Sequence, residues 1–240
     1  MANESGDMKL LGNYRRLIDL TAAEINYKPT NPLIEVVQMN AQHAAAMAAV
    51  NDLPTKIAPN KVAINERQAA YEALPELIRS SMNMLRASGA SKKIIDDAST
   101  FTRKVLGTRK SKPKVDNPDT PENEAAATHS ASQRSYDAQL GNLRSYTQIL
   151  VAEPLYNPNE TNLKTVFLTT VADDLEAKNN AVSTTFVPVS MARGLRDGLL
   201  YTNSESVVNA ALLSKAYVKA VFGKSSALYQ AIAAMEFKRR

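Results

Sequence analysis

The sequence predicts an all-α protein with two tandem up-and-down antiparallel helical bundles of three to four helices each, forming an elongated molecule. Glycine is scarce, with 8 residues among 240, while alanine, leucine, lysine and glutamate are plentiful. Glycine supplies the turns and bulges that sheets need, and alanine loses little side-chain entropy in a helix. Apolar residues also recur at helical spacing along most segments. A third observation is that the two halves of the chain resemble each other.

The resemblance between the halves indicates an internal duplication. Residues 13–29 align with residues 142–158 at a constant offset of 129. This offset pairs Asn13 with Asn142, Arg15 with Arg144, Leu20 with Ile149, Tyr27 with Tyr156 and Pro29 with Pro158. One inserted residue is then needed to place Leu33 on Leu163. Residues 101–107 match residues 217–223, and both segments end in glycine. The matches keep their order along the chain, which is typical of a repeated unit.

The first repeat is expected to begin with a helix over about residues 9–25, because its apolar residues fall on one face. Residues 27–31 predict a turn, in which Asn31 caps the next helix and Pro32 occupies its first position. Proline interrupts the i→i−4 hydrogen bonds of a helix. We therefore expect a break in this second helix near Pro54 and Pro59.

The rest of the first repeat holds two further expected helices. The first covers residues 66–86 and should be bent by Pro75. The next is opened by Ser91, and Gly107 ends it as a left-handed cap.

The second repeat is expected to follow the same order. Its second helix should start at Asn159–Glu160 and be kinked near Pro188. Whether the proline regions of either repeat form turns or kinks is open. Residues 204–208 open the next helix and Gly223 ends it. The last helix should cover residues 226–238, where the cations of residues 238–240 suit the negative end of the helix dipole.

A polar, charged linker over residues 108–131 divides the repeats, because it lacks an apolar period and is rich in Lys, Pro, Asp, Asn, Glu and Thr. The predicted domains are therefore residues 1–107, 108–131 and 132–240, comprising the first helical repeat, the linker and the second helical repeat.

Motifs that carry chemistry are lacking. The two histidines, His43 and His129, stand in neither a Glu-x-x-His nor a His-x-x-x-His pattern. With no cysteine in the chain, thiolate metal sites are excluded. Adjacent aspartates such as Asp96 and Asp97 point in different directions on a helix, so they form no acid–base couple. We expect no catalytic, cofactor-binding or metal site, and no enzymatic activity.

One cluster of charge stands out in a chain of net charge +5. Six cations occur within twelve residues: Arg103, Lys104, Arg109, Lys110, Lys112 and Lys114. One interpretation is a phosphate-binding patch for nucleic acid or an anionic membrane surface. The other is a solvated linker whose basic block is followed by a complementary acidic block. No aromatic residues interleave the cations, so nucleic-acid bases would have no stacking platform. The patch is the weaker of the two interpretations.

The sequences Tyr156-Asn157-Pro158-Asn159-Glu160-Thr161-Asn162-Leu163 and Tyr217-Val218-Lys219-Ala220-Val221-Phe222-Gly223 resemble a group of uncharacterised, internally duplicated helical bacterial proteins. This resemblance implies the duplicated helical fold and carries no activity or site.

The expected function is a non-enzymatic structural or interaction protein that self-associates through helix faces. Its expected partner is itself, as a homo-oligomer or filament, or another helical protein. The alternative is a binding module for an anionic partner, either nucleic acid or anionic lipid, through residues 103–114. Residues 1–7 lack the pattern of a signal peptide, and no run of about 18 apolar residues predicts a transmembrane segment. We expect a cytoplasmic protein, although a mature secreted form would have the same pattern.

Overall fold

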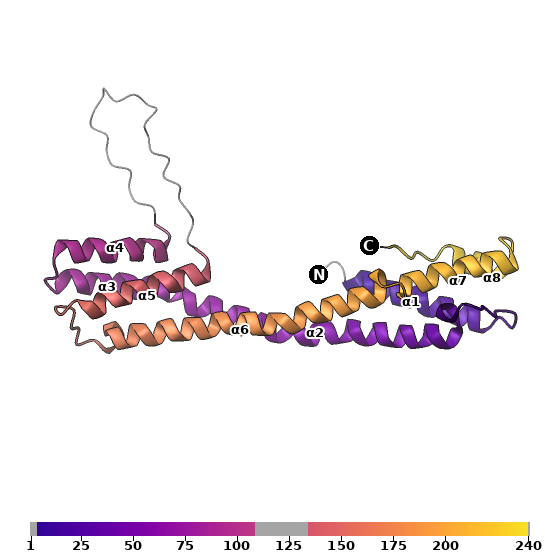
Figure 1. Ribbon diagram of the computed structural model, residues 1–240, viewed down its shortest axis with the longest axis horizontal. Helices are drawn as coiled ribbons and strands as arrows, with labels where there is room; N and C mark the ends of the chain where they lie inside the picture. The colour runs from indigo at the N-terminus through magenta and orange to yellow at the C-terminus, as the bar shows by residue number, and fades with distance from the viewer. Residues whose placement is uncertain (1–3, 109–133, 240) are drawn as a thin grey trace, which may run out of the picture. The chain divides into compact units, whose positions relative to one another are not determined.

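The computed structural model describes residues 4–108 and 134–239, and these ranges contain helices and no strand, which confirms the all-α class. The chain divides into two compact units. The first unit combines Met1–Lys61 with Thr184–Arg240, and the second unit is Val62–Ser183. The helices can be followed by their labels and colours in Figure 1.

The helices of the first repeat are α1 (Glu4–Ala22), the 3₁₀ helix η1 (Pro32–Ile34), α2 (Val36–Glu72), α3 (Leu74–Ala87) and α4 (Lys92–Leu106). Those of the second repeat are α5 (Tyr136–Ala152), the 3₁₀ helix η2 (Thr161–Leu163), α6 (Thr165–Asp197), the π-helix η3 (Gly198–Thr202), α7 (Val207–Phe222) and α8 (Ala227–Ala233).

The predicted tandem arrangement of the two bundles is not confirmed, because each compact unit contains segments of both repeats. In the first unit, Tyr27 shares a hydrogen bond of 2.9 Å with Ser214. In the second unit, Ser81 shares one of 2.9 Å with Tyr146. Each unit also has its own buried apolar cluster, made from helices of both halves of the chain. The compact units therefore follow a different division of the chain from the predicted repeats, and residues 109–131 of the predicted linker lie outside the described residues.

The mixing of the two repeats in each unit has its physical reason in helices α2 and α6, which contain residues of both units. Pro54 and Pro59 both lie inside α2, and Pro188 lies inside α6. The break expected in the second helix is therefore wrong, and none of the three prolines marks a turn. Each long helix carries the chain from one unit into the other.

The equivalence of the repeats is visible in their tyrosine–proline turns. The Tyr27 hydroxyl donates to the carbonyl of Ile34 at 2.8 Å, and the Tyr156 hydroxyl donates to the carbonyl of Leu163 at 2.7 Å. The offset of 129 therefore continues through the turn and pairs Ile34 with Leu163. The predicted one-residue insertion, which paired Leu33 with Leu163, is wrong. The same offset also pairs Pro59 of α2 with Pro188 of α6.

The predicted helix starts and stops are partly confirmed. The Asn31 side chain accepts a hydrogen bond from the Leu33 amide at 3.0 Å, but it caps the short η1 rather than a long helix. Ser91 caps α4, and Gly107 ends that helix in the left-handed region with φ of 67°. Pro75 does not bend a helix: α2 ends at Glu72, and Pro75 lies in the first turn of α3, where its missing N–H costs little.

Several ends of the expected helices differ from the structure. The first helix is Glu4–Ala22 rather than residues 9–25, and η2 and α6 begin at Thr161 and Thr165 rather than at 159–160. Gly223 does end α7, as predicted, but with φ of 80° and ψ of 162° it lies outside the left-handed helical region.

The last helix, α8, ends at Ala233, so Lys238 and Arg239 do not lie at its end. The Lys215 ammonium instead donates to the carbonyls of Ala233 and Met235, at 2.9 Å each. A cation from a neighbouring helix thus satisfies the carbonyls at this end of α8.

A buried ion pair ties α1 to the end of α6 within the first unit. The Asp7 carboxylate lies 3.5 Å from Nη1 of Arg196. The Asp7 side chain is 1% exposed and the Arg196 side chain is 11% exposed. The Tyr201 hydroxyl, on the π-helix η3, donates to Asp7 at 2.5 Å. Charges removed from water need such partners, because an uncompensated buried carboxylate is strongly destabilising.

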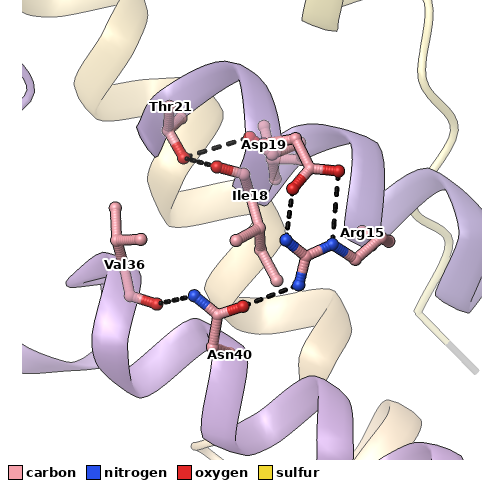
Figure 2. Close-up of polar contacts among 7 residues, drawn as sticks. Arg15, Ile18, Asp19, Thr21, Val36 and Asn40 are labelled. Atoms are coloured by element: carbon pink, nitrogen blue, oxygen red, sulfur yellow. Dashed lines mark hydrogen bonds and ion pairs between the residues drawn. The ribbon is translucent and has the colours of Figure 1, made fainter. Parts of the chain in front are cut away.

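Two equivalent arginines link the first helix of each repeat to the long helix that follows. Figure 2 shows the Arg15 guanidinium binding Asp19 on its own helix and donating to the Asn40 side chain of α2 at 2.7 Å. Arg144, at the same place in the second repeat, binds Glu176 of α6 at 2.7 Å. These pairs are exposed, so they contribute little to stability and mainly fix side-chain positions.

Candidate functional site

An exposed apolar face lies on the part of α6 that belongs to the first unit. Val187 is 55% exposed, Met191 72% and Leu195 60%. Because these residues follow one another at intervals of four, they lie on one side of the helix. We call these three residues the α6 apolar face. Helical geometry gives it a length of roughly 12 Å, at about 1.5 Å per residue.

The opposite side of the same helix packs into the first unit. Val189 is 2% exposed and Ala192 is 9% exposed. Helix α6 therefore has an apolar side that is buried and an apolar side that faces solvent. Residues 184–195 contain one charged residue, Arg193. A solvent-facing helix side normally carries polar and charged residues. The solvent-facing side of α6 is unusual because it is apolar.

The first repeat provides an internal comparison for this face. The offset of 129 pairs Val187, Met191 and Leu195 with Ala58, Val62 and Glu66 of α2. These three residues are exposed too, and the Glu66 side chain is 52% exposed and bound to Lys178 at 3.0 Å. The same helix position thus accepts alanine and a charged glutamate in one repeat, so the fold does not require large apolar residues there.

The α6 apolar face can bury area against another surface, but it offers no side-chain donor or acceptor of its own. Its exposed apolar area is on the order of 300 Å², as large as the main apolar patch of a typical monomer. Covering it would be favourable at about 25 cal/mol for each Å² removed from water. The largest apolar patch on a monomer is often functional, which makes this face a candidate contact surface.

The predicted basic patch is only partly within the described residues. Arg103 and Lys104 lie in the last turn of α4, where the helix dipole favours cations. The Lys104 ammonium lies 5.4 Å from the centroid of the Phe101 ring. The other predicted members, Arg109, Lys110, Lys112 and Lys114, lie outside the described residues. Arg103 and Lys104 are therefore the two members of the predicted patch that lie within the described residues.

Arg103 also has cationic neighbours that the sequence analysis did not identify. It lines a small cavity between α3 and α4 together with Arg79 and Arg86 of α3. Sequence reasoning missed these two arginines because it searched for cations close together in the chain. Their separation of seven residues, two helical turns, was the available signal.

His43 lies on α2, close to Tyr14 of α1, with 6.4 Å between the ring centroids. Partial burial lowers the pKa of His43, and the nearby Arg15 lowers it further. The other histidine, His129, is outside the described residues. Within residues 4–108 and 134–239, no group of three or more His, Asp or Glu side chains is placed to hold a metal ion.

No helix in the described ranges is both long enough and apolar enough to span a bilayer.

Comparison of the chain with protein-family models, with curated proteins and with solved structures finds no match. The resemblance to duplicated bacterial proteins therefore stays a prediction.

Proposed function

We propose that this protein is a non-enzymatic structural or interaction protein that self-associates through the α6 apolar face. The observation that supports this function is the exposure of Val187, Met191 and Leu195 on one side of a helix whose other side is already buried. The equivalent side of α2 carries Ala58 and Glu66 at two of the three positions. The apolar character of the α6 face is thus not a requirement of the repeated fold.

A second copy of this chain is the occupant that best fits the face. The face itself carries no charge, so it offers no electrostatic selection of an acidic or a basic partner. Two identical apolar faces can cover each other across a twofold axis, since such an interface is self-complementary.

The size of the face sets the expected strength. A standard interface buries about 800 Å² per partner, and the exposed area of the three side chains is well below that. We therefore expect a weak association that depends on protein concentration, with flanking polar contacts adding to the apolar centre.

Sedimentation velocity over a wide concentration range tests the proposal. The average mass should rise with concentration for the wild-type protein. Met191→Glu should weaken self-association by at least about tenfold, because the new carboxylate would lose its hydration in an apolar contact. Val62→Glu is the matched control, because Val62 is the equivalent exposed residue of α2, and it should leave self-association unchanged.

Two results would contradict the proposal. One is a wild-type protein that stays strictly monomeric at every concentration. The other is an equal loss of self-association in Met191→Glu and Val62→Glu, which would place the contact elsewhere or assign the effect to net charge. Circular dichroism of both variants controls for folding, and both substituted side chains are exposed.

A further inference from the structure

Three arginines line one small cavity in the second unit, between α3 and α4. The cavity has a volume of about 210 Å³. Arg79 and Arg86 reach it from α3 and Arg103 reaches it from α4, while Ser99 and Thr102 contribute hydroxyl groups. None of the described residues that line it is an aspartate or a glutamate. Among the residues that the structure describes, the cavity therefore gathers three positive charges and no negative charge in its lining.

The convergence of the arginines follows from the geometry of the two helices. Residues seven apart lie on the same side of a helix, which places Arg79 and Arg86 together. A short turn containing Gly89, with φ of 84°, joins α3 to α4, and the two helices pack against each other. The side of α4 that faces α3 then brings Arg103 to the same cavity.

These arginines differ from the other arginines that link helices in the molecule. Arg15 and Arg144 each bind a carboxylate. In contrast, none of Arg79, Arg86 and Arg103 has a salt bridge to any residue within 4–108 or 134–239. The helix dipole accounts for cations in the last turns of α3 and α4, which contain Arg86 and Arg103. It does not account for Arg79, which lies in the middle of α3.

Most of the guanidinium N–H groups have no hydrogen-bond partner within residues 4–108 and 134–239. Arg86 donates to the Asn83 side chain at 2.9 Å, and Arg103 has a long contact of 3.5 Å with the Thr100 hydroxyl. A guanidinium has five N–H donors in a fork that matches the oxygens of a phosphate or carboxylate. Three such groups around one cavity supply more donors than the described part of the chain uses.

The lining beneath the arginines is apolar and offers no charge that competes with them for an anion within the described residues. Ile78 is 0% exposed and Met82 is 4% exposed. Arg79 and Arg86 are exposed and Arg103 is half-buried, so an anion can reach their guanidinium groups from solvent. The hydroxyls of Ser99 and Thr102 donate to backbone carbonyls of α4, at 2.7 Å and 3.2 Å. The arginines are therefore the donors that an anion would meet.

We propose that this cavity binds a phosphate group. Its volume is below the range of about 300–1,000 Å³ that is usual for pockets that enclose a drug-sized ligand. A phosphate fits in such a space, whereas a whole nucleotide would extend out of it. The phosphate can belong to a free phosphate ion or to the monoester headgroup of an anionic lipid, because the arginines recognise the same oxygens in both. This site is separate from the α6 apolar face.

The test uses the full chain with two probes, inorganic phosphate and vesicles that contain phosphatidic acid. Calorimetric titration measures phosphate binding, and co-sedimentation measures vesicle binding. The double variant R79Q/R103Q should weaken binding of the effective probe by roughly a hundredfold, about tenfold for each charge-assisted hydrogen bond that it removes. The double variant K93Q/K104Q removes the same charge from the same two-helix region, but neither lysine lines the cavity. Its affinity should stay close to that of the wild type.

The two probes distinguish the sources of the phosphate. Binding of free phosphate that needs Arg79 and Arg103 assigns the site to a soluble ligand, and vesicle binding alone with the same requirement assigns it to a lipid headgroup. Absence of binding to both probes at low salt overturns the proposal. An equal loss in R79Q/R103Q and K93Q/K104Q also overturns it, since general basicity would then explain the binding. The Met191→Glu variant should bind phosphate normally, which separates this result from self-association.

Discussion

Tyr27 and Tyr156 allow a stability prediction to be made twice in one molecule. They occupy the same position in the two repeats, and each donates its hydroxyl hydrogen to the carbonyl of the residue seven positions later. Tyr27 has a second partner, since its oxygen lies 2.9 Å from the Ser214 hydroxyl. Replacing each tyrosine by phenylalanine keeps the ring and removes only the hydroxyl.

The expected losses of stability depend on the number of groups left without a partner. Leaving a buried donor or acceptor unsatisfied costs about 1–3 kcal/mol. Tyr156→Phe affects one carbonyl, that of Leu163, and should lower the free energy of unfolding by about 1–3 kcal/mol. Tyr27→Phe affects the Ile34 carbonyl and also Ser214, which is 0% exposed. We expect it to cost about 1 kcal/mol more than Tyr156→Phe.

Urea unfolding followed by far-ultraviolet circular dichroism measures both losses, with a shift of midpoint at constant slope. Tyr229→Phe is a suitable control, because this ring is only half-buried. A surface-like change of that kind should stay within about 0.5 kcal/mol. The reasoning is refuted if Tyr27→Phe is no more destabilising than Tyr156→Phe, or if neither differs from the control.

Two further predictions concern the buried tyrosines and the mixed composition of the units. Burial raises the pKa of Tyr156 to about 12, and it also raises the pKa of Tyr27. An unfolded tyrosine titrates near pH 10, so between pH 10 and 12 the folded state holds more protons than the unfolded state. The free energy of unfolding should therefore be at its full value below pH 10 and fall as the pH rises through this window. Urea midpoints measured from pH 9 to 12 check this, and an unchanged midpoint up to pH 12 would contradict it. If the chain is cut at residue 120, neither fragment should unfold cooperatively alone, whereas the co-expressed fragments should purify together and regain the helical signal. Cooperative melting of one isolated fragment would count against the mixed units.

The sequence features that predicted the fold correctly are local ones. Asn31 and Ser91 precede their helices and accept amide hydrogen bonds from two or three residues ahead, so their role depends on a few neighbouring residues. Gly107 ends α4 for an equally local reason, because its φ of 67° suits a residue without a side chain. Helix caps of this kind can be predicted without knowing what the helix packs against.

The prolines show why the bundle arrangement could not be predicted in the same way. A proline removes one backbone hydrogen bond, so the local rule predicts a break. Tertiary packing outweighs that loss in α2 and α6, where Asn60 next to Pro59 donates to Thr185 near Pro188 at 3.0 Å. The two prolines are related by the same offset of 129 as the tyrosines. That relation was readable in the sequence, and it indicated a shared position inside two equivalent helices.

Both candidate surfaces depend on the three-dimensional structure, namely on side-chain exposure for the α6 apolar face and on helix packing for the arginine cavity. Helix α6 is apolar on two opposite sides, so its pattern indicates no single face, and exposure is needed to separate Val189 from Met191. The arginine cavity requires α3 and α4 to be packed together, because Arg79 and Arg103 are 24 residues apart in the chain. Neither the exposure of Met191 nor the packing of α3 against α4 can be predicted from residue spacing alone.

The duplication separates what the fold needs from what a particular face does. Met39 and Leu168 are equivalent, and both are 0% exposed, so both repeats use a large apolar residue where burial requires one. On the outer side of the long helices the repeats differ, with Glu66 in one and Leu195 in the other. Because the equivalent position of α2 holds a charged glutamate, the repeated helix does not itself require an apolar residue there. An exposed apolar face also raises the risk of non-specific association. Its presence in only one repeat therefore favours a specific contact made by α6, and the comparison of Met191→Glu with Val62→Glu tests that difference directly.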